Sequence, residues 1–277
     1  MVTLLHESFM QHALWASLLV SIACGVMGSL IVVNRLSFMS GGIAHGAYGG
    51  VGLALYFGWP VWLVTSGFCA GLAMILGLLS EERHERTDTL IGVIWAAGMS
   101  LGVVMINLTP GYAQNLMSYL FGSLLTVTRQ DIALMGIGDL LMLALVAYNF
   151  RDLMSMSFDR DFARSRGVPV RALQLVLLVL IAETIVMLIQ VVGLVLVIAL
   201  LTLPPALAER HTRSLRGMML AAAGWSLLSS VGGLLLAYAY DLSSGASIVA
   251  VACACYTLLA ALQKVLNYMR QSNAVGA

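Results

Sequence analysis

Three ionisable side chains lie within long apolar stretches of the sequence. His45 follows a run of small residues, Glu183 lies in the middle of LVLLVLIAETIVMLIQ, and Asp139 lies about two turns inside another run. A charged group in a membrane helix is costly unless it faces the bundle interior or water. Imidazole and carboxylate groups are also possible ligands. We therefore treat His45, Glu183 and Asp139 as candidates for a polar pathway through the membrane.

Each of these residues also has a simpler interpretation. A neutral imidazole is cheap to bury, so His45 fits a hydrogen-bonded core histidine equally well. Asp139 is near enough to a helix end to be solvated. Glu183 is harder to explain in this way, and Gln190 follows it at a spacing of seven residues, which places both on one helix face.

Small residues surround His45 at helical spacing. The residues one turn before and after it, at a spacing of four, are both glycine, and a second set of glycines with the same spacing lies on the adjacent face. Such a pattern leaves room around an imidazole, and it also permits close helix packing. The glycines expected to pack near the pathway are Gly41, Gly42, Gly46, Gly49 and Gly50.

The composition predicts an all-α, polytopic membrane protein. Of the 277 residues, 60% are hydrophobic and only 10% are charged, and the mean hydropathy is +0.95. A soluble domain of this size does not tolerate such a surface, so the chain is expected to contact membrane lipid. The formal net charge of +1 gives no support to nucleic-acid binding. The four cysteines lie in apolar runs and are expected to pack as small hydrophobic residues without disulfides.

Apolar runs of bilayer length predict about eight to nine transmembrane helices in a single domain, residues 1–277. The nine predicted helices are Phe9–Val33, Ser40–Phe57, Val61–Leu79, Leu90–Leu108, Asp131–Phe150, Leu173–Gln190, Gly193–Leu207, Gly217–Tyr240 and Ala246–Leu266. The segment LMSYLFGSLL between two of them is too short to span a bilayer, so we expect an interfacial or re-entrant helix there.

The distribution of basic residues predicts the orientation. The stretch from Ala172 to Ala208 is too long for one crossing, and Gly193 is the best position for a reversal. With that reversal and the N-terminus outside, nearly all Lys and Arg side chains lie in cytoplasmic segments, as the positive-inside rule expects. Arg129 is the exception.

The longest polar interruption, Arg151 to Arg171, is expected to be a cytoplasmic loop that contains a short amphipathic helix. Ser157 or Asp159 can cap this helix, and Gly167 can end it. No nucleotide-binding motif occurs in the sequence, and the nearest approach to a zinc-protease motif, His6-Glu7 followed by His12, lacks the required spacing. The sequence therefore predicts no enzyme, and any ATP dependence must come from a separate subunit.

Five segments occur in a distinctive order along the chain: SFMQHALWASLLVSIACGVMGSLIVVNRLSFMSGGIAHGAYGGVGLAL, LMSYLFGSLL, SFDRDFARSRGVPVRAL, VVGLVLVIALLTLPPALA and DLSSGASIV. They resemble the permease subunits of ATP-binding-cassette importers for zinc, manganese and iron. The resemblance runs nearly end to end. It implies the permease fold of metal and cobalamin importers, in a multi-pass protein of the prokaryotic cytoplasmic (inner) membrane.

The resemblance also implies partners and a substrate. The permease would be a homodimer that binds a cytoplasmic ATP-binding subunit and receives a divalent metal ion from an extracytoplasmic metal-binding protein, with no permanently bound cofactor. The loop 151–171 would be the coupling-helix loop that contacts the ATPase. Its contact residues would be Ser157, Phe158, Asp159, Phe162, Ala163, Arg164 and Gly167.

The sequence departs from the family at the metal-gating motif, an aspartate four residues before a histidine. His45 matches the histidine, but Gly41 stands where the aspartate is expected. Glu183 or Asp139 can supply the missing carboxylate, the ion can pass with fewer protein contacts, or the substrate can differ from a bare cation. We favour Glu183, because relatives carry an apolar residue there. The alternatives are an importer for a metal chelate or small cofactor and, from another class, an ATPase-independent channel or scaffold.

Overall fold

In a computed structural model, the described residues are 8–82, 87–109, 122 and 124–275, and they form helices without any strand. The nine long helices are α1 (Ser8–Val33), α2 (Ser37–Phe57), α3 (Val61–Glu82), α4 (Thr87–Leu108), α6 (Arg129–Tyr148), α9 (Val170–Val192), α10 (Leu194–Glu209), α11 (Leu215–Tyr240) and α12 (Ser244–Val275). Three short helices are η3 (Leu124–Thr126), α7 (Phe150–Phe158) and α8 (Arg160–Ser165).

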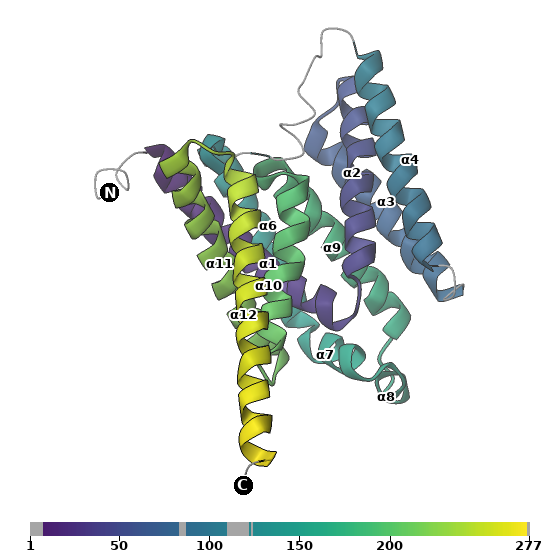
Figure 1. The fold of residues 1–277 in the computed structure, drawn as a ribbon. Helices are drawn as coiled ribbons and strands as arrows, with labels where there is room; N and C mark the ends of the chain where they lie inside the picture. Colours follow the sequence, from purple (N-terminus) through teal and green to yellow (C-terminus); the bar gives the residue numbers. More distant parts are fainter. Residues whose placement is uncertain (1–7, 83–86, 110–121, 123, 276–277) are drawn as a thin grey trace.

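The nine predicted helices correspond one to one with these nine long helices. Seven of them are long and apolar enough to cross a membrane, and α2 and the 16-residue α10 fall outside that set among the described residues. Several helices extend beyond the predicted apolar runs because their polar ends need no lipid contact. The largest extension is that of α12, which continues to Val275 and protrudes beyond the other helices (Figure 1).

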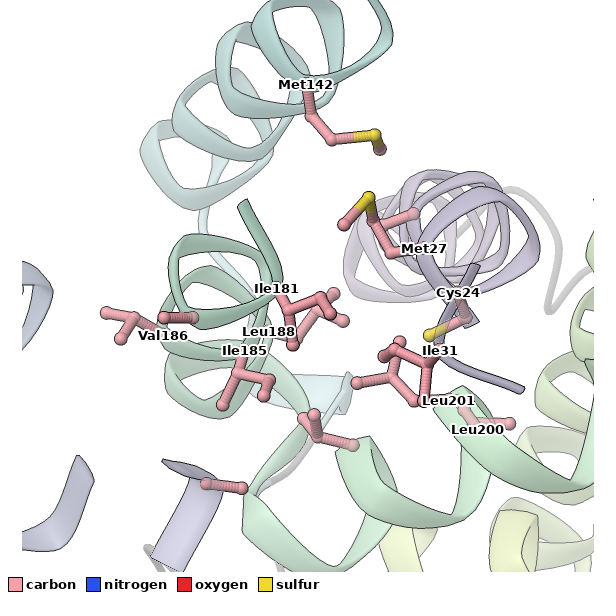
Figure 2. Packing of buried hydrophobic residues seen from close by; sticks show 14 of the residues in the cluster. Cys24, Met27, Ile31, Met142, Ile181, Ile185, Val186, Leu188, Leu200 and Leu201 are labelled. Atoms are coloured by element: carbon pink, nitrogen blue, oxygen red, sulfur yellow. The ribbon is translucent and has the colours of Figure 1, made fainter. Parts of the chain in front are cut away.

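The helices form two groups joined by α9. On one side, α1 and α10 pack together with α6, α11 and α12, and on the other, α2 packs against α3 and α4 (Figure 1). Figure 2 shows the apolar core between α1, α6, α9 and α10, in which Met27 of α1 and Met142 of α6 point toward each other. Cys24 and Cys69 are buried, as expected for small hydrophobic residues, whereas Cys255 is half-buried and Cys253 is exposed.

The predicted reversal at Gly193 is confirmed. Gly193 has φ 80°, a conformation that glycine adopts without steric penalty, and it separates α9 from α10. Gly122 packs against this turn so closely that a Cβ atom there would lie 2.4 Å from the backbone nitrogen of Gly193. The segment LMSYLFGSLL falls mainly outside the described residues.

One end of the bundle carries α7 and α8 (Figure 1). Four arginines lie in these helices or directly after them, namely Arg151, Arg160, Arg164 and Arg166. The Arg216 guanidinium, at the start of α11, lies 4.9 Å from the ring centre of Phe150 in α7. Arg129 lies at the other end, where its Nε donates to Nε2 of His12, near the start of α1, at 3.4 Å. We call the end with α7 and α8 the basic end. This separation follows the charge pattern of the sequence.

Candidate functional site

Glu183 lies near the middle of α9, on the side that faces α3. Its side chain is half-buried, and its carboxylate accepts a hydrogen bond from the Ser66 hydroxyl of α3. A carboxylate in an apolar helix requires such a partner or water, because an unpaired buried charge is costly. Gln190, predicted to lie on the same face, is exposed. Glu183 is therefore a polar group held in place within the membrane part of the fold.

His45 lies in α2, which packs directly against α9. Its half-buried ring stacks on Trp95 of α4, with ring centres 3.9 Å apart and planes at 11°. Nδ1 is buried and has no hydrogen-bond partner among the described residues. An imidazole nitrogen with a free lone pair is a ligand for transition metals. The stack fixes the ring, and Nδ1 is a possible ligand in the tautomer that carries no proton there.

The glycines near His45 differ in what surrounds them. A Cβ atom at Gly42 would lie 2.6 Å from Cγ2 of Ile91, and one at Gly46 would lie 2.6 Å from Cδ1 of Leu72. Gly49 and Gly50 are similarly enclosed, whereas a Cβ at Gly41 meets no atom within 4 Å. Most of these glycines therefore serve close helix packing. Gly41 alone among them opens onto free space, one turn before His45.

Asp139 lies in α6 on the face turned to α1. It is 3% exposed, and it shares this face with the buried Met135 and Met142 at spacings of four and three. Neither of its carboxyl oxygens has a hydrogen-bond partner within the described parts of the chain. Asp139 is thus buried in the apolar core beside α1 and apart from the α3–α9 contact of Glu183.

These three candidates do not form one metal site within the chain. The described residues contain no group of three or more His, Cys, Asp or Glu side chains that could hold a metal ion. His45 and Glu183 lie on neighbouring helices and offer one nitrogen ligand and one carboxylate ligand. Such an arrangement suits weak, successive contacts along a path, because an ion in transit must also leave.

The polar stretch 151–171 forms two short helices where the sequence predicted one. Of the two predicted caps, Asp159 caps α8, accepting from the backbone N–H groups of Asp161 and Phe162 at 3.0 and 2.9 Å. Ser157 lies inside α7 instead. The break occurs at Asp159, whose backbone is extended because its side chain binds the backbone of the next turn. Gly167 follows α8 with φ 81°, in the predicted role of terminator.

The predicted coupling residues form an exposed surface over a small core. Phe158 is 70% exposed and Phe162 is 54% exposed, whereas Ala163 is fully buried. Arg164 pairs with Asp161 at 3.4 Å, and both side chains are largely exposed. Two large exposed aromatic residues at the basic end favour contact with another protein.

Sequence reasoning missed two residues of this site. Ser66 contacts Glu183 across 117 positions, and Trp95 stacks on His45 from another helix. Neither has a sequence signal of its own, since serine and tryptophan are ordinary in membrane helices. Only the packing of α3 and α4 gives these residues their partners.

Comparison with known proteins places the chain in a family. Residues 6–263 match the model of the ABC 3 transport family. An uncharacterized membrane protein of Synechocystis is 45% identical, with 95% of this chain and 94% of that protein covered. The manganese transport system membrane protein MntC of Halalkalibacterium halodurans is 34% identical, with 92% of this chain and 87% of that protein covered.

A solved structure has the same fold. PsaBC from Streptococcus pneumoniae, in complex with Fab, matches with a TM-score of 0.84 and 28% identity, covering 93% of this chain and 92% of the matched chain. Together with the apolar helices, the match identifies a multi-pass protein of the cytoplasmic (inner) membrane. The chain belongs to the ABC 3 transport family and is a permease, the membrane subunit of a transporter.

Proposed function

We propose that this permease imports a divalent transition metal, namely zinc, manganese or iron, across the cytoplasmic membrane with energy from ATP. The observation that carries the proposal is the family match over residues 6–263. A relative of this chain is named for manganese transport. The half-buried His45 and Glu183 on adjacent helices add ligands of the type such ions require. A separate ATP-binding subunit would hydrolyse ATP, and an extracytoplasmic protein would deliver the ion.

In this proposal the ion passes His45 and Glu183 in succession. Nδ1 of His45 has no hydrogen-bond partner among the described residues and is free to bind a cation. The Glu183 carboxylate supplies the negative charge that Gly41 lacks, and Ser66 holds it in position. In a homodimer each ligand occurs twice, so two copies of the chain provide a fuller set than one.

The basic end would face the cytoplasm and bind the ATPase. The positive-inside rule favours this orientation. Phe158 and Phe162 are exposed and provide an apolar surface there, with the Arg166 guanidinium 5.9 Å from the ring centre of Phe162. Loop 151–171 would then receive the movement of the ATPase and pass it to the helices on either side, α6 and α9. A change between outward and inward access requires such rigid-body movement of helices.

The test is uptake by the whole transporter in proteoliposomes. The permease is reconstituted with its ATP-binding subunit, and the extracytoplasmic metal-binding protein is added on the substrate side. The uptake of Mn²⁺, Zn²⁺ and Fe²⁺ is measured with and without ATP. We expect ATP-dependent uptake of at least one ion, accompanied by metal-stimulated ATP hydrolysis. Uptake without ATP would indicate a channel, and failure of the permease to co-purify with any ATP-binding subunit would contradict the proposal.

A metal chelate is the second candidate substrate, and the open space at Gly41 is the observation that favours it. No atom lies within 4 Å of a Cβ built there, so this position is less crowded than those of the neighbouring glycines. Counting metal and chelator separately in the uptake assay distinguishes the two substrates. Metal import without chelator supports the bare ion.

A further inference from the structure

A chain of hydrogen bonds joins the end of α1 to α7 at the basic end. Nδ2 of Asn34 donates to Oγ of Ser157 at 2.9 Å and also to the backbone oxygen of Leu30 at 2.9 Å. Oγ of Ser157 in turn donates to the backbone oxygen of Leu153 at 2.7 Å. Asn34 and Ser157 are both half-buried, and 123 positions separate them.

The residue after Asn34 forms a tight, strained turn into α2. Arg35 has φ 58°, a left-handed conformation that is unfavourable for a residue with a side chain. Its N–H donates to the Val32 oxygen at 3.0 Å, and the Leu36 N–H donates to the Ile31 oxygen at 2.8 Å. This pattern is a Schellman motif. Since α2 begins at Ser37, the connection between α1 and α2 is short and allows little independent movement of the two helices.

The two helices that carry the proposed ligands are linked to the coupling loop in different ways. Helix α9, with Glu183, follows α8 in the chain after only four residues, so a movement of α8 reaches it covalently. Helix α2, with His45, is distant in sequence. The contact of Asn34 with Ser157 connects the beginning of α2 to the same loop, one residue before the exposed Phe158.

We propose that the hydrogen bond from Asn34 to Ser157 is the positioning contact that transmits movement of α7 and α8 to α2 and His45. The proposal rests on the proposed function of the loop 151–171 as the contact with the ATPase. Asn34 and Ser157 touch no substrate in this account. They act through the Arg35 turn, which converts a displacement at Ser157 into a displacement of the start of α2.

The test measures metal transported per ATP hydrolysed in proteoliposomes that contain the permease and its ATP-binding subunit. Asn34→Leu and Ser157→Ala each remove the bond, and we expect each to lower this ratio by about two- to tenfold, the range that one net hydrogen bond corresponds to. The double variant is expected to match the single variants, because both remove one interaction. The rate of ATP hydrolysis by the Asn34→Leu variant should persist, because Asn34 is not among the expected ATPase-contact residues.

Two control variants separate coupling from general stability. Ser157→Thr keeps the hydroxyl and should keep the wild-type ratio. Asn149→Leu removes a bond of the same kind, from an asparagine amide to the Leu145 oxygen at 2.9 Å. That bond lies within one helical turn and joins no distant segments. It should leave the ratio unchanged.

Distinct results refute the inference and the proposed function. Wild-type ratios in both single variants, or a double variant in which the two losses multiply, would overturn the role of Asn34 and Ser157 while leaving metal import intact. Absence of ATP-driven metal uptake by the wild-type complex would instead overturn the proposed function, and the inference with it.

Discussion

The hydroxyl of Ser66 in α3 donates a hydrogen bond to the Glu183 carboxylate in α9. This contact explains how an acidic side chain is retained in the middle of an otherwise apolar helix. It also fixes the carboxylate on the side of α9 that meets the helix group containing His45. The chemistry of the proposed pathway therefore depends on a serine that has no catalytic or ligand role itself.

Removing this hydroxyl should weaken both folding and transport. Ser66→Ala leaves the carboxylate without its partner, and we expect a loss of about 1.5–3 kcal/mol in the free energy of unfolding, typical of a hydrogen bond to a charged group. Uptake should fall because Glu183 is no longer oriented. Thermal unfolding in detergent and metal uptake measure the two effects.

The neighbouring residue provides a matched control. Thr65 is buried, and its hydroxyl has no partner among the described residues. Thr65→Val removes a hydroxyl from the same turn of α3 at nearly constant volume, so it should affect neither property by as much. Equal effects of the two substitutions would contradict the positioning role of Ser66.

Asp139 should prove dispensable for transport. Both of its oxygens lack a partner in the described structure, and it is 3% exposed, so its carboxylate is unfavourably placed. We expect Asp139→Asn to leave uptake within about twofold and to leave the free energy of unfolding unchanged or raised, because a neutral amide is less costly to bury than a carboxylate.

A second carboxylate on the same helix should behave differently. Asp131 accepts hydrogen bonds from the backbone nitrogen and hydroxyl of Thr128, at 2.9 and 2.7 Å, in a capping box. Asp131→Ala should therefore destabilise the protein by about 1 kcal/mol.

If folded Asp139→Asn protein lost uptake, Asp139 and not Glu183 would be the stronger candidate for the missing carboxylate.

The exposed aromatic surface of α8 should be needed for coupling but not for folding. Phe162→Ala and Arg164→Glu alter exposed side chains, so the free energy of unfolding should change by less than about 0.5 kcal/mol. Each is expected to lower metal transported per ATP hydrolysed. Phe57→Ala is a suitable control, because Phe57 is equally exposed, at 54%. It is the last residue of α2, at the opposite end of that helix from the Arg35 turn. Normal coupling by Phe162→Ala would remove this assignment.

Much of the fold could be predicted from the sequence because bilayer-length apolar runs define membrane helices directly. The reversal at Gly193 followed from the excessive length of one run and from the side of the basic residues. The break at Asp159 could not be resolved, since Ser157 and Asp159 are both good capping residues and only the backbone shows which one caps.

The candidate site was less predictable, because its properties arise from contacts between distant segments. His45 and Glu183 stood out as ionisable groups, but their partners Trp95 and Ser66 lie on other helices. Gly41 and Gly42 are identical in sequence, yet one faces free space and the other is enclosed by Ile91. Sequence spacing identifies a helix face and does not show what that face meets.

Moving the carboxylate from position 183 to position 41 offers a rescue experiment. Glu183→Gln removes the proposed anionic ligand, and Gly41→Asp adds a carboxylate one turn before His45, where a Cβ meets no atom within 4 Å. Carboxylate and imidazole at this spacing lie on one helix face. As a steric control, Gly42→Ala should destabilise the fold, because its Cβ would lie 2.6 Å from Ile91.

ATP-driven metal uptake by the Glu183→Gln variant, with and without Gly41→Asp, tests most directly whether the ion passes His45 and Glu183. We expect Glu183→Gln alone to lower uptake by about tenfold, equivalent to about 1.4 kcal/mol of lost interaction with the ion. Adding Gly41→Asp should restore most of it. Wild-type uptake by Glu183→Gln would contradict the account, as would a loss that the new carboxylate beside His45 does not repair.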